Sequence, residues 1–187
     1  MSFEAAPAGE AVSLERAIEI GARHHQVGRL AEAEGICRQV LAIDPDNFDA
    51  LRLLGVVALQ LQRYPDAAAL VKRATDVQAG SAQALSNLGL AFRGQGDLEQ
   101  ACAAFERAVA LDPAFVGARS NLALVLQARG DTHGAIEQLR IVIATEPGNV
   151  EALQNFDRSR ISVHLFHTGF ASIERKPRRK ELRGLHE

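Results

Sequence analysis

The stretch SNLGLAFRGQGDLEQACAAFERAVALDP, residues 86–113, decides the fold of this chain of 187 residues. Leu88 and Phe92 stand four positions apart in its first half. Ala101 and Phe105 repeat that spacing in its second half. Apolar and small residues three or four apart mark one face of an α-helix rather than a strand. The stretch therefore predicts two helices joined by a short turn.

The same kinds of residue return at a constant offset of 34 positions. Four units align without a gap, and they start at Leu14, Phe48, Ala82 and Val116. Their shared columns include Ile20, Leu54, Leu88 and Leu122; Gly21, Gly55, Gly89 and Ala123; and Ala33, Ala67, Ala101 and Ala135. One helical hairpin cannot bury its own apolar face, so such units are expected to stack on one another. Small residues are needed where the stacked helices approach closely.

Glycine and proline mark the predicted helix ends. A glycine between the two helices of a unit suits a left-handed turn, and it is found at Gly28, Gly96 and Gly130. Gln62 takes that place in the second unit. Prolines close three of the four units, at Pro45, Pro113 and Pro147, because the residue before proline disfavours the helical conformation.

A repeat of this length with these columns resembles the tetratricopeptide repeat family, which also occurs as the repeat arm of O-GlcNAc transferase-like enzymes and in other bacterial proteins. The resemblance covers residues 14–149 and implies an all-α fold. That fold is a right-handed superhelical solenoid of helix-turn-helix repeats. In this family the first helix of each repeat lines the concave side, and the same is expected here.

The predicted organisation follows from these boundaries. Four repeats are expected at residues 14–47, 48–81, 82–115 and 116–149. Residues 1–12 predict a disordered lead-in. A fifth unit begins at Val150, but Asp157 and Arg160 break its columns. Residues 150–160 are therefore predicted to form a capping helix with a polar outer face.

Residues 161–187 form an atypical basic C-terminal tail. From Arg158 onward the chain has eight Lys or Arg against three acids. The segment that begins at Ile161 fits either a helix or a short alternating strand. The tail is interpreted as a solvated, mobile end or as the remnant of a longer chain, and a contact for nucleic acid, acidic lipid or the repeat body is the alternative. Nucleic acid is not an expected partner, since Phe166 and Phe170 lie outside the basic cluster.

The composition favours a cytoplasmic protein. The formal net charge of −2 selects no partner, and a content of 47% hydrophobic residues is enough for a continuous core. No apolar run approaches the length of a membrane span or of a signal peptide. Cys37 and Cys102 are expected to be free thiols, which suits a reducing compartment.

No catalytic or metal-binding pattern stands out. His24 and His25 are adjacent, and His164 and His167 are three apart, but no cysteines or carboxylates accompany them at ligand spacing. Phosphate-binding loops, nucleophile elbows and dinucleotide fingerprints are missing from the sequence. The chain is therefore predicted to be no enzyme, with no catalytic residues, no metal and no cofactor.

One column on the predicted first helices points to a binding surface. Asn87, Asn121 and Asn155 recur at the offset of the repeat. A row of amides can give and accept hydrogen bonds with an extended peptide backbone. The row is similar to the asparagine ladder in the repeat arm of O-linked N-acetylglucosamine transferases, but Glu19 and Leu53 interrupt it in the first two units. The alternative is that these asparagines only bond to a neighbouring helix.

The predicted peptide-binding set also includes polar neighbours on the same helices, namely Arg52, Ser86, Arg93, Ser120 and Gln127. Arg119 is a further candidate for the groove, and arginine there suits a partner that carries carboxylates. Relatives that clamp the acidic C-terminal tails of chaperones use lysines on their first helices. Lys72 is the one lysine within the repeats and stands on a second helix, so that function is not expected.

Two functions of different class remain open at this stage. The preferred hypothesis is a non-enzymatic scaffold that binds an extended peptide or a helix of another protein in the concave groove. The alternative is the substrate-recruiting arm of a larger enzyme, such as a glycosyltransferase, sulfotransferase or methyltransferase, whose catalytic domain is absent here. Neither hypothesis involves a small-molecule substrate for this chain, and both are compatible with an oligomer.

Overall fold

The structure is a computed structural model that describes residues 13–173, with side chains described as far as Ile161. The predicted lead-in at residues 1–12 and most of the predicted basic tail lie outside these described residues. Within them the chain forms nine helices and no strand. The helices are α1 Leu14–Gln26, α2 Leu30–Ile43, α3 Phe48–Gln60, α4 Tyr64–Val77, α5 Ala82–Gln95, α6 Leu98–Leu111, α7 Val116–Ala128, α8 Thr132–Thr145 and α9 Val150–Ile173.

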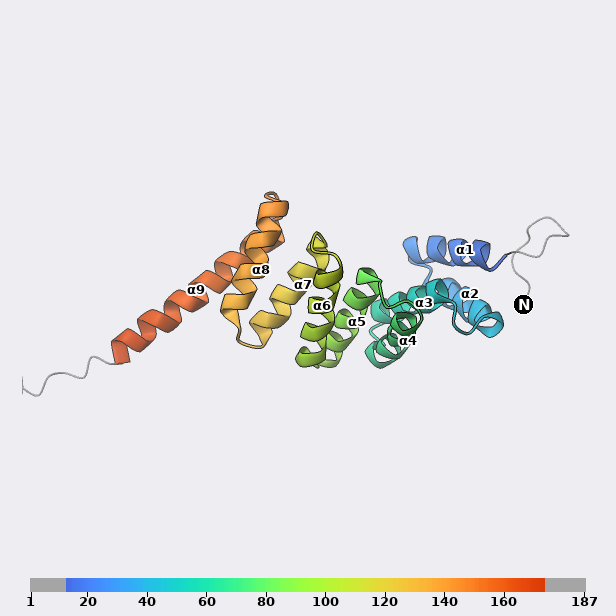
Figure 1. Cartoon of the computed structure of the whole chain (residues 1–187), viewed down its shortest axis with the longest axis horizontal. Coiled ribbons are helices and arrows are strands. Elements are labelled where there is room, and N and C mark those ends of the chain that lie inside the picture. The colour runs from blue at the N-terminus through green and yellow to red at the C-terminus, as the bar shows by residue number, and fades with distance from the viewer. Residues whose placement is uncertain (1–12, 174–187) are drawn as a thin grey trace, which may run out of the picture.

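The helices stack in chain order into an elongated solenoid (Figure 1). Each helix packs mainly against the helices before and after it, and the two ends of the described chain lie at opposite ends of the molecule (Figure 1). The all-α superhelix expected from the sequence repeat is confirmed.

The curvature of the stack follows from which helices touch. The first helices of successive pairs contact one another, α1 with α3, α3 with α5, α5 with α7, and α7 with α9. The second helices α2, α4, α6 and α8 make no such mutual contacts within the described residues. A stack that closes on one side and opens on the other bends toward the closed side. The first helices therefore line the inner, concave side, and crevices open between the second helices outside.

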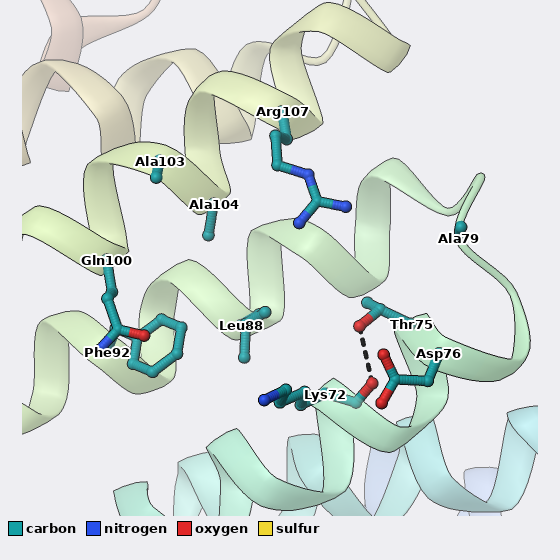
Figure 2. Close-up of a pocket in the computed structure, with 10 residues that line it drawn as sticks. All are labelled: Lys72, Thr75, Asp76, Ala79, Leu88, Phe92, Gln100, Ala103, Ala104 and Arg107. Carbon is teal, nitrogen blue, oxygen red and sulfur yellow. Dashed lines mark hydrogen bonds between the residues drawn. The ribbon is translucent and has the colours of Figure 1, made fainter.

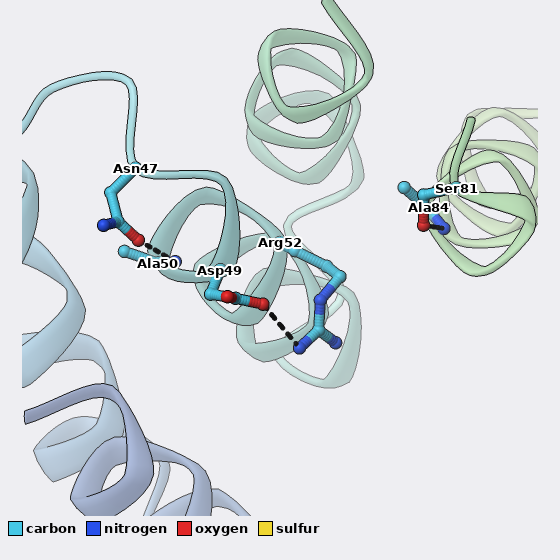
Figure 3. Close-up of polar contacts among 6 residues, drawn as sticks. All are labelled: Asn47, Asp49, Ala50, Arg52, Ser81 and Ala84. Atoms are coloured by element: carbon cyan, nitrogen blue, oxygen red, sulfur yellow. Dashed lines mark hydrogen bonds and ion pairs between the residues drawn. The ribbon is translucent and has the colours of Figure 1, made fainter. Parts of the chain in front are cut away.

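Side-chain caps start most of the first helices. Ser13, Asn47, Ser81 and Asn149 accept a hydrogen bond from the backbone N–H three residues later, at 2.9 to 3.2 Å. Figure 3 shows the caps of α3 and α5. These positions also recur at the offset of the repeat, and only Phe115, before α7, lacks a capping oxygen. Each cap satisfies one of the free N–H groups at a helix start.

The predicted left-handed turns are confirmed. Gly28, Gly96 and Gly130 have φ values of 77°, 80° and 86°. Gln62 adopts φ of 57° at the equivalent place, which a side chain disfavours. The column therefore serves the same turn in all four helix pairs, although one member is not glycine.

The small-residue columns lie where helices meet. The four alanines of one column are completely buried, and they are Ala33, Ala67, Ala101 and Ala135. A Cβ atom at Gly55 would lie 2.5 Å from Val71, and one at Gly89 would lie 2.8 Å from the Phe105 ring. These glycines let the first helix of a pair approach the second closely enough for Val71 and Phe105 to be buried completely.

The last helix differs from the expected cap. It runs from Val150 to Ile173, past the predicted end at residue 160, so the segment that begins at Ile161 is helical rather than a strand. Its described part is also less polar than expected, because Val150, Leu153 and Ile161 are exposed. The residues equivalent to Leu153 in the second and third pairs, Leu51 and Leu85, are buried, and no second helix follows α9 within the described residues to cover Leu153 in the same way.

Both cysteines are free and buried, as expected. Burial, with a smaller contribution from Glu34, raises the pKa of the Cys37 thiol from 9.0 to about 11. Burial likewise raises the pKa of Cys102, whose Sγ lies 3.4 Å from Glu106 Oε1. Neither thiol is set up as a nucleophile, because the thiolate is the disfavoured form in both places.

Replacing Cys37 by valine is expected to remove a pH-dependent part of the stability. The buried thiol stays protonated to about pH 11, whereas the thiol of the unfolded chain ionises near 9.0. Its contribution is therefore complete below pH 9.0 and is lost as the pH rises toward 11. The loss amounts to roughly 2–3 kcal/mol. Urea unfolding of both proteins across this range measures it.

The valine variant keeps the site apolar, since Val71 occupies the same column in the next unit. The free energy of unfolding of the natural chain should fall more steeply above pH 9.0 than that of the variant. Parallel pH profiles would contradict the assignment of this pKa to the folded Cys37.

Candidate functional site

The concave side carries the predicted asparagine row, and its three members differ in their surroundings. Asn87 on α5 is almost completely buried, at 5% exposure. Its Oδ1 accepts a long hydrogen bond of 3.4 Å from Gln83, and its Nδ2 donates to no described atom. A buried donor without an acceptor destabilises the fold, so Asn87 is not explained by packing alone.

Asn121 on α7 has its amide fully engaged. Its Oδ1 accepts a hydrogen bond of 2.8 Å from Arg93 Nη1, and its Nδ2 donates to the carbonyl of Gly117 at 2.9 Å. The Arg93 bond joins α5 to α7. Asn121 therefore fits the alternative stated for the asparagine row, in which the side chain bonds to a neighbouring helix rather than to a peptide.

Asn155 on α9 is buried at 8% exposure and belongs to a third arrangement. Its backbone carbonyl accepts a hydrogen bond of 2.9 Å from Ser159 Oγ. Gln127 on α7 donates to the same Ser159 Oγ at 3.0 Å. Ser159 was missed by the sequence analysis, although it follows Val57, Ala91 and Val125 in a column whose first member is Arg23, so the change from an apolar residue to serine was a usable signal.

The difference between Asn87 and Asn121 at Oδ1 follows from the residue 28 positions earlier on the preceding first helix. Arg93 precedes Asn121 by that interval and bonds to it. The same interval before Asn87 leads to Leu59, which has no hydrogen bond to give. Leu59 therefore explains why Asn87 Oδ1 lacks the cross-helix donor that Asn121 Oδ1 has, while the Nδ2 of Asn87, which meets no acceptor among the described residues, is a separate feature.

The other predicted site residues lie on the same helices but are not gathered at one point. Arg52 forms an ion pair of 3.3 Å with Asp49 on its own helix α3 (Figure 3). Ser86 is buried at 3% exposure, and Ser120 is half-buried. The set predicted from sequence is therefore spread along the groove from α3 to α9.

The expectation that Arg119 reaches the groove is wrong. Its Nε donates to the carbonyl of Pro113 at 2.9 Å, and its Nη1 donates to Gln138 Oε1 on α8 at 2.9 Å. The guanidinium therefore ties α7 to the second helix of its own pair. These two bonds direct the charge away from the concave side.

A depression of about 310 Å³ lies on the concave side between α3 and α5. It is lined by Leu59, Gln60, Tyr64, Leu90, Arg93 and Gly94. The Tyr64 ring packs so closely on Gly94 that a Cβ atom there would overlap it. Of the lining residues only Arg93 was predicted, because nothing in the alternation of apolar and polar residues marks Tyr64 as a neighbour of α5.

Other kinds of site find no support in the described part of the chain. No three His, Cys, Asp or Glu side chains there are grouped so that they could hold a metal ion. None of the helices searched there combines the length and the apolar character that crossing a membrane requires.

Three models described as tetratricopeptide repeat match residues 24–88, 82–115 and 116–140, in one continuous run through the helix pairs. The chain belongs to the tetratricopeptide repeat family. Among curated proteins no significant match to this repeat protein is found.

Solved structures of repeat proteins share the architecture. MamA is 27% identical with a TM-score of 0.73, over 81% of this chain and 89% of that one. The O-GlcNAc transferase of Thermobaculum terrenum is 26% identical with a TM-score of 0.68, over 70% of this chain but only 26% of its own. The first repeat domain of Spaghetti (RPAP3), solved with an HSP90 peptide, is 19% identical with a TM-score of 0.60 and is similar in fold alone.

Proposed function

We propose that this repeat protein is a non-enzymatic scaffold that binds an extended peptide or a helix of a partner protein in its concave groove. The depression between α3 and α5 carries the proposal. Leu59 and Leu90 give it apolar walls, while Gln60 and Arg93 supply polar groups at its side. A partner segment can place one apolar side chain there and bond its backbone to the polar groups.

The free amide of Asn87 supports the same site. Asn87 lies one turn before Leu90 on α5, so both side chains share a face of that helix. Within the described chain its Nδ2 atom is enclosed and has no acceptor, and the only hydrogen bond of the amide is the long one that Oδ1 accepts from the exposed Gln83. A partner carbonyl that displaced Gln83 and met an amide turned so that Nδ2 faces it would give Asn87 the acceptor that the folded chain does not supply.

Leu90→Ala is expected to weaken partner binding by about tenfold or more, because it removes an apolar wall of the depression. Asn87→Ala is expected to weaken it by about threefold or more, because it removes a hydrogen-bond donor. The probe is a peptide selected on the whole protein from a phage-displayed random library. Its affinity for each variant is measured by isothermal titration calorimetry. The Asn87 variant should keep its stability, because the substitution removes a buried donor without an acceptor in the described chain and only one long hydrogen bond, the one from Gln83.

Two variants serve as controls. Asn121→Ala breaks the bonds to Arg93 and Gly117, so it should lower stability more than affinity. Ile143→Ala shortens a half-buried aliphatic side chain on the second helix α8 and should leave affinity unchanged. Peptides that bind equally well to the natural chain and to the Leu90 variant would reject the groove as the site.

A second candidate function rests on the match to an O-GlcNAc transferase, of which this chain covers only the smaller part. In that case the repeats would recruit protein substrates for a catalytic domain outside this sequence. Immunoblotting of the natural protein distinguishes the two. A band much larger than 20.1 kDa would favour the recruiting arm, and a band of that mass would favour the free scaffold.

The proposal includes a cytoplasmic location and a protein partner rather than a small molecule or nucleic acid. Two buried free thiols suit a reducing compartment. The groove combines apolar walls with few charges, which suits a polypeptide better than a polyanion.

A further inference from the structure

A second depression opens on the outer side of the solenoid. It has a volume of about 480 Å³ and lies between the second helices α4 and α6 (Figure 2). Its walls carry Lys72 and Asp76 from α4 and Arg107 from α6, and its floor carries Leu88 and Phe92 from α5. It therefore faces away from the groove between the first helices.

The apolar floor faces open space because one residue in it, Ala104, is small. Ala104 stands in a column where the first two units have Ile36 and Leu70. Leu88 and Ala104 are buried at 7% and 4% exposure, and both line the depression. A larger side chain at Ala104 would fill the space between α4 and α6, as the equivalent leucine does one unit earlier.

The rim is cationic. Lys72 and Arg107 come from opposite walls and point toward the same depression (Figure 2). Neither forms an ion pair with any residue in the described part of the chain. The Thr75 hydroxyl is occupied by its bond of 2.7 Å to the Lys72 carbonyl. Asp76 adds one negative charge, so the depression keeps an excess of one positive charge.

The equivalent crevice one unit earlier shows that this is not a general feature of the stack. That crevice, between α2 and α4, contains Glu34. Glu34 pairs with Arg38 at 2.7 Å and with Arg63 at 2.8 Å, and with Asp66 also in the lining the charges of that crevice cancel. Leu70 also projects into it. The crevice at Ala104 thus has more open space than its counterpart, and its lysine and arginine are not paired with a carboxylate of the described residues.

We propose that this outer depression binds an acidic segment of a partner protein that carries one apolar side chain. The apolar side chain would lie on Leu88, Phe92 and Ala104, where its burial away from water would favour binding. Carboxylates on either side of it would meet Lys72 and Arg107. The site is independent of the concave groove, so two partners or two parts of one partner can bind together.

The test uses a labelled peptide with one phenylalanine between runs of three glutamates, titrated onto the full chain at low salt by fluorescence polarisation. Saturable binding is expected. Ala104→Leu should weaken it by about tenfold or more, because the leucine occupies the floor. Lys72→Gln should weaken it by about threefold or more. Ala104→Leu is compatible with the fold, since Leu70 holds the same place in the preceding unit.

Matched controls separate this site from others. Arg140→Gln removes a cation at the position on α8 that corresponds to Lys72 and should have no effect. Gln60→Arg changes the groove and should also have no effect. Lack of saturable binding, equal binding by a peptide with serine in place of phenylalanine, equal binding by a lysine peptide, or full affinity in the Ala104 variant would each overturn the proposal. Lys72→Gln alters only a surface charge, so its result stands even if Ala104→Leu unfolds.

Discussion

Replacing Phe105 by alanine is expected to lower the free energy of unfolding by about 3–5 kcal/mol. Phe105 is completely buried on α6 and fits against Gly89 of the paired helix α5. It belongs to the core cluster that continues through Leu122 and Leu139 to Ala152 on α9. Loss of the ring therefore leaves a cavity between units as well as within one. Urea unfolding followed by circular dichroism measures the change.

A second variant controls for the loss of aromatic character. Phe105→Leu should be less damaging, because Leu139 fills the same column in the next unit. A loss below about 1 kcal/mol for Phe105→Ala would be too small for a full cavity and would contradict the placement of this side chain at the centre of the stack.

Alanine at Gly89 and alanine at Gly35 are expected to change stability in opposite directions. At Gly89 the new Cβ would lie 2.8 Å from the Phe105 ring, which is buried and cannot move aside. A loss of about 1–3 kcal/mol should follow from overpacking. At Gly35, on the exposed face of α2, a Cβ meets nothing within 4 Å. Alanine there should add about 0.5–1 kcal/mol, because it favours the helix more than glycine does.

Both variants introduce the same methyl group into a helix interior, so thermal unfolding of the two compares position alone. Equal stability changes would show that helix propensity rather than close approach sets the glycine column. The predicted pattern is a lower midpoint for Gly89→Ala and a higher one for Gly35→Ala.

The architecture could be predicted from sequence because it depends on properties that each residue carries by itself. Small size at Gly89 and Ala101, apolar bulk at Phe105 and a tolerance for positive φ at Gly96 are visible in the letters. Repetition at a constant offset then predicts which of these residues lie against one another in the stacked helices. The caps recur at the same offset, so they too are visible in the sequence, at Ser13, Asn47, Ser81 and Asn149.

The site could be predicted only in outline because hydrogen bonds depend on pairs of residues in different units. Whether the amide oxygen of an asparagine on a first helix accepts a bond from the preceding first helix depends on the residue 28 positions earlier, which is Leu59 for Asn87 and Arg93 for Asn121. Arg119 has two acceptors close to it, and these outweigh any attraction of the groove. Which of several possible partners a side chain bonds to cannot be predicted from the residues found at one position of the repeat.

Photo-crosslinking from the groove tests the proposed function most directly. A benzophenone amino acid is placed at Gln60, which is exposed and lines the concave depression, or at Glu137, which is exposed on the second helix α8. Each protein is produced in the cells from which the chain comes, and crosslinked polypeptides are identified by mass spectrometry. A partner polypeptide captured from Gln60 and not from Glu137 is the predicted result. Capture of nothing from Gln60, or of the same polypeptides from both positions, would contradict the groove as the binding surface.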